Sequence, residues 1–143
     1  MPQISRFESS GIGAKGLGFT VEVELKERFT ELIDLITGEF IERIVRRDAE
    51  KIKTAAQANA PYRTGWLHDH IEVRSAVTST DAIVEVGVDL AVVPYAAHQE
   101  FGTVNHPAHP YLRPAIDEKE PFLLRSIGEG VRLEIKKALG SGV

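Results

Sequence analysis

Proline and glycine divide the middle of this 143-residue chain into short pieces. Three stretches hold these residues: A-P-Y-R-T-G-W-L (60–67), P-Y-A-A-H-Q-E-F-G-T (94–103) and H-P-A-H-P-Y-L-R-P-A (106–115). Proline fixes its own φ and lacks an N–H, whereas glycine tolerates positive φ, so both mark places where a chain turns or an element ends. Regular structure between residues 60 and 115 must therefore consist of short elements.

Outside this middle, the apolar residues show two periods. Residues 19–25 alternate between apolar and polar side chains, which predicts a strand with one buried face. From about residue 28 the apolar residues recur every three or four positions, which predicts one long amphipathic helix. This stripe comprises Phe29, Ile33, Ile36, Phe40, Ile44, Val45, Ala49, Ile52 and Ala56. The helix should end at Asn59, because the residue before Pro61 is biased away from helical angles. At ~1.5 Å per residue it would be about 48 Å long, and Gly38 is a candidate bend.

The remaining pattern predicts a hairpin and two helical segments. Residues 71–77 and 84–88 read as paired strands joined by a turn at 79–81. One helical turn should follow Pro94 and end at Gly102. Apolar residues from Ile116 to Ile135 repeat at about four, which predicts a C-terminal helix that Pro121 kinks or divides.

These elements predict an α+β fold. A small antiparallel sheet of three or more strands should pack with the long helix of the N-terminal half and with the C-terminal helix. The glycine-rich residues 1–18 read as a flexible arm, and residues 19–143 as a single domain.

Composition excludes several classes of function. The net charge of −4 argues against a broad phosphate-binding face. The absence of cysteine excludes disulfides and thiolate metal sites. No apolar run reaches the ~20 residues of a membrane span, and the first residues lack the apolar stretch of a signal peptide. We expect a globular protein that contacts no membrane.

Histidines and carboxylates are the residues that could carry chemistry. The histidines are His68, His70, His98, His106 and His109, and the carboxylates in or near turns are Asp69, Asp81, Asp89 and Glu100. No H-E-x-x-H helix, ordered Ser/His/Asp set, P-loop or G-x-G-x-x-G accompanies them. We therefore predict no catalytic residue, no metal and no cofactor.

The three stretches resemble the tail-completion, or head–tail joining, proteins of long-tailed double-stranded DNA phages. That family's pattern runs A-P-x-x-T-G-x-L, two strands, Y-A-x-x-x-E-F-G-T, P-A-x-P-F-L-R-P-A and a final helix. The resemblance implies a structural virion protein of the tail or neck, made in the host bacterial cytoplasm. It further implies a ring of six copies around the DNA channel. Its partners would be head connector or head-closure proteins and tail terminator or tail tube proteins, and DNA would pass without specific binding.

Two groups of residues follow from the matched positions. The expected structural turn residues are Pro61, Arg63, Thr64, Gly65, Glu100, Phe101, Gly102 and Thr103. We expect positive φ at Gly65 and Gly102. Glu100 should accept backbone N–H groups or pair with Arg63 or Arg113. The candidate interface residues, on an exposed loop stiffened by proline or beside a turn, are Trp66, Pro107, Pro110, Tyr111, Leu112, Arg113 and Pro114.

Two other functions stay open at this point. One is a small metal-dependent hydrolase using His106, His109 and a carboxylate. The other is a soluble, dimeric binding module encoded by a prophage. The mass of the native particle separates them, because a ring, a zinc-containing monomer and a dimer differ in size.

Overall fold

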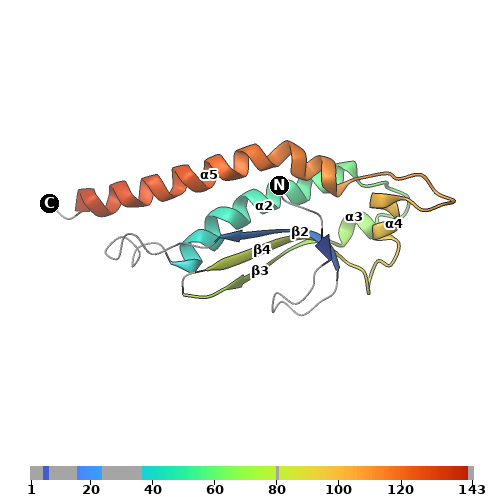
Figure 1. The fold of residues 1–143 in the computed structure, drawn as a ribbon, viewed down its shortest axis with the longest axis horizontal. Coiled ribbons are helices and arrows are strands. Elements are labelled where there is room, and N and C mark those ends of the chain that lie inside the picture. Colours follow the sequence, from blue (N-terminus) through green and yellow to red (C-terminus); the bar gives the residue numbers. More distant parts are fainter. Residues whose placement is uncertain (1–4, 7–15, 24–36, 80, 142–143) are drawn as a thin grey trace.

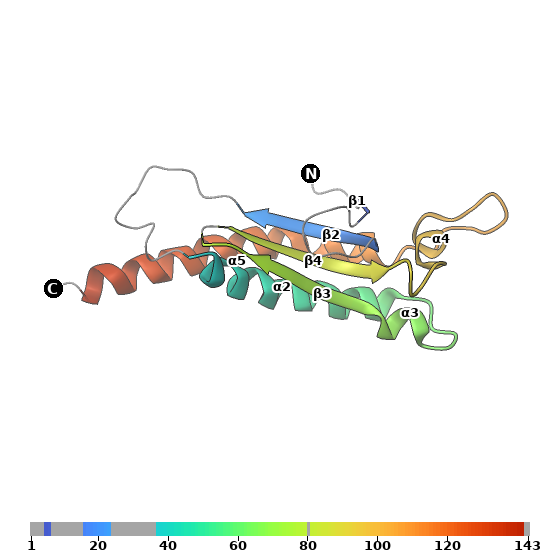
Figure 2. The ribbon, with the colours of Figure 1, turned by 90° about the horizontal axis from the view of Figure 1, so that it is seen from below.

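The structure, a computed structural model, describes residues 5–6, 16–23, 37–79 and 81–141. Its elements form two layers, a sheet and a pair of long helices on one face of that sheet (Figures 1 and 2). The elements in chain order are β1 (Ser5–Arg6), β2 (Gly16–Val23), α2 (Gly38–Asn59), α3 (Trp66–Asp69), β3 (Ile71–Val77), β4 (Ala82–Asp89), α4 (Ala96–Phe101) and α5 (Leu112–Ser141).

The sheet is antiparallel, with the strand order β1-β2-β4-β3. The hairpin of β3 and β4 pairs Val73 with Val86 and Val77 with Ala82. Glu85 and Gly87 of β4 are buried on the face away from the helices, and every second residue from Ala82 to Val88 is buried toward the helices. These core residues are Ala82, Val84, Val86 and Val88. The α+β class, the antiparallel pairing and the presence of one long helix in each half of the chain are thus as predicted.

The first long helix is shorter than its sequence pattern predicts. Thr37 has extended angles (φ −82°, ψ 159°), and its hydroxyl accepts the Phe40 N–H at 3.2 Å, so Thr37 is the N-cap of α2. A single helix from residue 28 to 59 is therefore wrong, since no helix passes through Thr37. The part of that prediction at residues 28–36 lies outside the described residues. The predicted end at Asn59, before Pro61, is confirmed.

Gly38 is the first residue of α2 and not a bend within it. Its N–H donates to the Ser79 carbonyl at 3.1 Å. A Cβ at this position would lie 2.1 Å from the Thr78 carbonyl oxygen. The start of α2 therefore rests directly on the turn between β3 and β4, and only glycine permits that approach.

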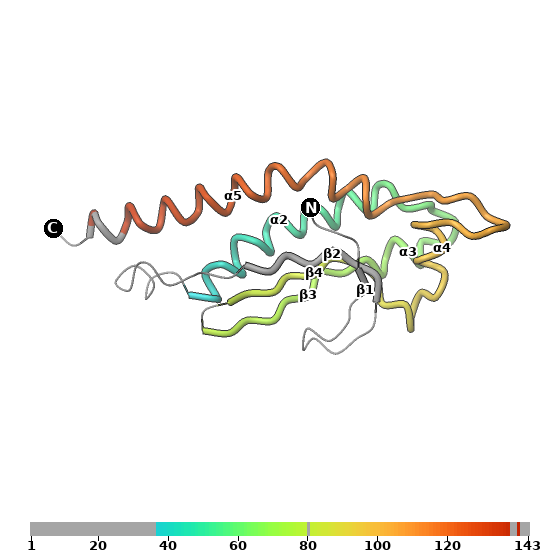
Figure 3. The backbone as a smooth tube through the Cα atoms, in the orientation of Figure 1, coloured from blue at the N-terminus to red at the C-terminus, as the bar shows by residue number. Residues whose placement is uncertain are grey.

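The second long helix continues through Pro121 as one element. Of the two effects predicted for Pro121, a kink or a division, the division is therefore wrong. It runs antiparallel to α2, with Ser126 bonded to Arg47 at 2.7 Å and Gly130 packed on Ile44. Figures 1 and 3 show that its last turns extend past the start of α2. Packing along most of its length holds α5 helical despite the donor that Pro121 removes.

Several predictions concern residues only partly described. Of the predicted arm, residues 1–4 and 7–15 lie outside the described part, Ser5–Arg6 form β1, and residues 16–18 belong to β2. Residues 24 and 25 of the predicted first strand and Thr80 of the predicted turn also lie outside it.

Candidate functional site

A buried carboxylate organises the end of the molecule where the three sequence stretches meet. Glu100, on α4, is 3% exposed. Its Oε2 accepts the backbone N–H groups of Tyr111 and Leu112, and its Oε1 accepts that of Arg113, each at 2.9 Å. We call this arrangement the Glu100 clamp. It ties α4 to the start of α5.

The clamp accounts for every free donor in the first turn of α5. The first four N–H groups of a helix have no partner inside the helix. In α5 these four positions are Tyr111, Leu112, Arg113 and Pro114. Glu100 accepts the N–H groups of the first three, and Pro114 has no N–H to satisfy. A carboxylate at this end also interacts favourably with the helix dipole.

Of the two roles predicted for Glu100, the structure shows the one with backbone partners. In the described part of the chain, the guanidinium groups of Arg63 and Arg113 form no ion pair. Both arginines are exposed. Two cations near the clamp are therefore free for another partner.

Tyr111 and Leu112, expected at an interface, are instead part of the core. Both are 0% exposed. The Tyr111 hydroxyl donates to the Ala96 carbonyl at 3.2 Å. Burial, with the nearby Glu100 and Tyr95, raises the pKa of Tyr111 above its ordinary value. Their backbone N–H groups bind Glu100, which places both residues in the core. Of the other residues expected at an interface, Pro107, Pro110, Arg113 and Pro114 are exposed, as expected.

The loop after α4 folds back over that helix. Gly102 ends α4 with φ +74°, and a Cβ there would lie 2.7 Å from the Ala108 nitrogen. Thr103 and His106 exchange backbone hydrogen bonds, and the His109 N–H donates to the Gln99 carbonyl at 2.7 Å. The positive φ predicted for Gly102 is therefore present, and the loop needs it to close.

The two histidines of this loop, His106 and His109, contact each other. The rings of His106 and His109 meet edge to face with centroids 5.6 Å apart. Across the residues that the structure describes, no group of three or more histidines or carboxylates could hold a metal ion. These contacts offer no support for a hydrolase built on His106 and His109.

The A-P-Y-R-T-G stretch forms the turn that leads into α3. Gly65 has φ +81°, as predicted, and a Cβ there would lie 2.8 Å from the Tyr62 hydroxyl. The Thr64 hydroxyl accepts the Trp66 N–H at 3.3 Å. The Trp66 indole N–H donates to the Val92 carbonyl at 3.3 Å, which fixes a half-exposed aromatic ring at the surface.

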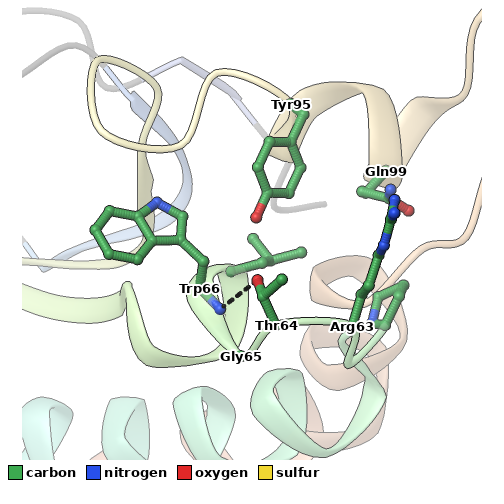
Figure 4. A pocket seen from close by; sticks show the side chains of 8 residues that line it. Arg63, Thr64, Gly65, Trp66, Tyr95 and Gln99 are labelled. Atoms are coloured by element: carbon green, nitrogen blue, oxygen red, sulfur yellow. Dashed lines mark hydrogen bonds between the residues drawn. The ribbon is translucent and has the colours of Figure 1, made fainter.

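A pocket of about 400 Å³ opens between this turn and α4 (Figure 4). In Figure 4 the Tyr95 hydroxyl points toward Thr64, Arg63 extends toward Gln99, and the Trp66 ring stands on the far side. We call this the Arg63 pocket. It combines aromatic walls with the free guanidinium of Arg63. Its full lining is Pro61, Arg63, Thr64, Gly65, Trp66, Leu67, Tyr95 and Gln99.

Large apolar side chains are exposed around the pocket. We call this group the apolar end; its members are Tyr62, Trp66, Val92, Tyr95, Phe101 and Val104. Sequence reasoning identified Trp66 and Phe101 but missed the pocket residues Tyr95 and Gln99. Tyr95 opens the Y-A-x-x-x-E-F-G-T block, which was the available signal. Gln99 is one helical turn from Tyr95, and only the fold places it against Arg63.

None of the described helices is both long and apolar enough to cross a bilayer. In a comparison with known families, residues 23–102 fit the HK97-gp10-like family, described as "Bacteriophage HK97-gp10, putative tail-component". No curated protein and no solved structure matches the chain. The matched segment contains β3, β4, α4 and the Arg63 pocket.

Proposed function

Because the chain belongs to the HK97-gp10-like family of phage tail components, we propose that it completes the tail at its head-proximal end. Six copies form a ring around the DNA channel and couple the tail to the head connector. Membership of this family supports a structural virion protein that contacts other virion proteins. The ring, its position and its partners are the proposal.

The apolar end is the observation that carries this proposal. Six large apolar side chains are exposed on segments that the Glu100 clamp and two positive-φ glycines hold in place. Exposed apolar clusters of this kind mark protein contacts. A fixed surface also loses little conformational freedom when a partner covers it.

The two ends of the molecule differ, as a ring requires. A head-to-tail contact joins two unlike faces of the same chain and closes into a ring when the rotation between copies permits. The apolar end offers one face, and the exposed flank of α5 offers another. The acidic net charge of −4 suits a channel wall along which DNA slides without binding.

Removing the gene from its phage, or from the prophage that carries it, tests the proposal. We expect full heads and unattached tails by electron microscopy, and restored joining when the chain is supplied in trans. A tagged chain should appear at the head-proximal end of the tail. Normal virions without the chain, or label at the distal end, would overturn the proposal.

A further inference from the structure

The structure points to the residues by which neighbouring copies touch. We propose that the Arg63 pocket of one copy receives a strip on α5 of the next copy. The strip consists of Phe122, Glu129 and Leu133. Leu133 fills the pocket beside Trp66, and Glu129 pairs with Arg63. This inference rests on the proposed ring and assigns its contact.

The strip is an exposed flank of α5, with apolar side chains at Phe122 and Leu133, that its own domain does not bury. Its residues are 7 and 4 positions apart, which at 3.6 residues per turn places them on one flank of α5. Phe122 is 62% and Leu133 59% exposed. The face of α5 that packs on the domain carries Ile116, Leu123, Ile127 and Val131 instead.

The charges of the two surfaces are complementary. Arg63 lies in the pocket wall without an ion pair among the described residues. Glu129 lies one turn before Leu133 and contacts Arg125 at 3.0 Å, with both side chains largely exposed. An exposed pair of this kind contributes little, so Glu129 can exchange it for Arg63 at small cost.

One chain cannot satisfy both surfaces by itself. The pocket lies near the start of α5, because Asn59, shortly before Arg63, bonds to the Tyr111 carbonyl at 3.3 Å. Leu133 lies 21 residues beyond Leu112, which is about 32 Å along the helix. A contact between the two surfaces therefore requires a second copy.

Disulfide trapping tests the contact directly, since the chain has no cysteine. Arg63→Cys combined with Glu129→Cys should give covalent oligomers up to a closed ring, in purified protein and in particles. A bond within one chain is excluded, because the two Cα atoms are much farther apart than the ~7 Å a disulfide allows. The matched control is Arg63→Cys with Leu124→Cys, since Leu124 is 67% exposed on the opposite flank of α5.

A charge exchange gives the second measurement. Arg63→Glu and Glu129→Arg alone should each lower ring formation about fivefold, and the double variant should restore it. Leu133→Ala should lower ring formation, whereas Leu124→Ala should not. Circular dichroism of each variant shows that the fold is intact.

The outcomes separate the contact from the ring. Oligomers from the Arg63/Glu129 cysteine pair alone, with rescue by the charge exchange, support the contact. Rings without that cross-link, equal cross-linking in the control, or a cross-link to another tail protein would overturn the contact while leaving the ring intact. Wild-type chain that forms no ring in protein or particles contradicts the proposed function itself.

Discussion

At Glu100 the two carboxylate oxygens share three backbone donors, and no residue of another type reproduces this geometry. A shorter aspartate does not reach, and glutamine replaces one accepting oxygen with a donor. Charge-assisted bonds of this kind exceed neutral ones in strength. The E-F-G-T motif is thus explained by backbone geometry. Glu100 accepts hydrogen bonds from backbone N–H groups, and Gly102 adopts the positive φ that the following turn needs.

We expect Glu100→Ala to lower the free energy of unfolding by about 3–5 kcal/mol, because three N–H groups lose their partner in a buried site. Glu100→Gln should cost about 1–3 kcal/mol, since one oxygen remains. Urea unfolding measures both. Glu118→Ala, which removes an exposed pair with Lys119, is the control and should change stability by under about 0.5 kcal/mol. Values for both Glu100 variants within 1 kcal/mol of wild type would contradict the clamp.

Tyr111 predicts a pH dependence. Its pKa is raised in the folded state, so folding favours the protonated phenol. The unfolded chain releases this proton near pH 10, whereas the folded chain keeps it. The stabilisation that the Tyr111 phenol contributes is therefore fully present below pH 10. Above pH 10 the free energy of unfolding falls by about 1.4 kcal/mol per pH unit.

Tyr111→Phe tests this dependence. At neutral pH it should cost about 0.5–1.5 kcal/mol through the lost bond to the Ala96 carbonyl. The difference from wild type should then shrink above pH 10 and vanish or reverse by pH 11, because only the wild type loses stability by this titration. Urea unfolding at pH 8, 10 and 11 measures it, and parallel stability curves would show that the phenol does not contribute.

At the scale of elements, local patterns predicted the interiors of helices and strands better than their boundaries. The apolar stripe from Phe29 to Ala56 is continuous in sequence, yet Thr37 caps α2 because its hydroxyl reaches the Phe40 N–H. Pro121 opposes a helix locally, but packing against α2 outweighs the lost hydrogen bond. The inward position of Tyr111 depends on a carboxylate 11 residues earlier, which periodicity cannot show.

Two glycines of α5 separate helix propensity from packing. A Cβ at Gly128 meets nothing within 4 Å, whereas a Cβ at Gly130 would lie 2.4 Å from Ile44 Cδ1. Gly128→Ala should stabilise the protein by about 0.5–1 kcal/mol. Gly130→Ala should stabilise less or destabilise, because Ile44 must move.

The Ile44→Val background tests whether the close contact with Ile44 Cδ1 causes this difference, since valine lacks that atom. In that background Gly130→Ala should regain most of the stabilisation seen at Gly128. Thermal melts of the four variants form the cycle. Equal effects of both alanines in the native background would mean that α5 does not approach α2 this closely.

At the scale of the whole molecule, six of the ten large apolar side chains that are exposed among the described residues belong to the apolar end. Its helices α3 and α4 lie at the end farthest from the projecting turns of α5 (Figure 1). The sequence alone located the motifs that build this end, because their prolines and glycines indicate turns. It could not place Tyr95, Gln99 and Arg63 around one pocket, since that depends on how α4 folds back on the turn before α3.

Phe101→Ser and Val104→Ser together should separate assembly from folding. Both side chains are exposed, so the melting temperature should stay within about 2 °C of wild type. Head–tail joining should fall at least about tenfold, as for loss of a buried contact residue. Val77→Ser, at the opposite end of the sheet, is the matched control. Undiminished joining would mean that Phe101 and Val104 contact nothing in the virion.

Because of the Glu100 clamp, the segment between Gly102 and Pro110 can also change in length and sequence without disturbing the rest of the fold. Both ends of this segment are fastened by one side chain, so its length barely affects the rest of the domain. Lengthening a surface loop costs only about 0.6 kcal/mol for each doubling. A fluorophore or epitope inserted beside Val104 and Asn105 would thus leave the fold of the domain intact. Related chains could change partners here by exchanging this short piece while leaving the sheet and both long helices untouched.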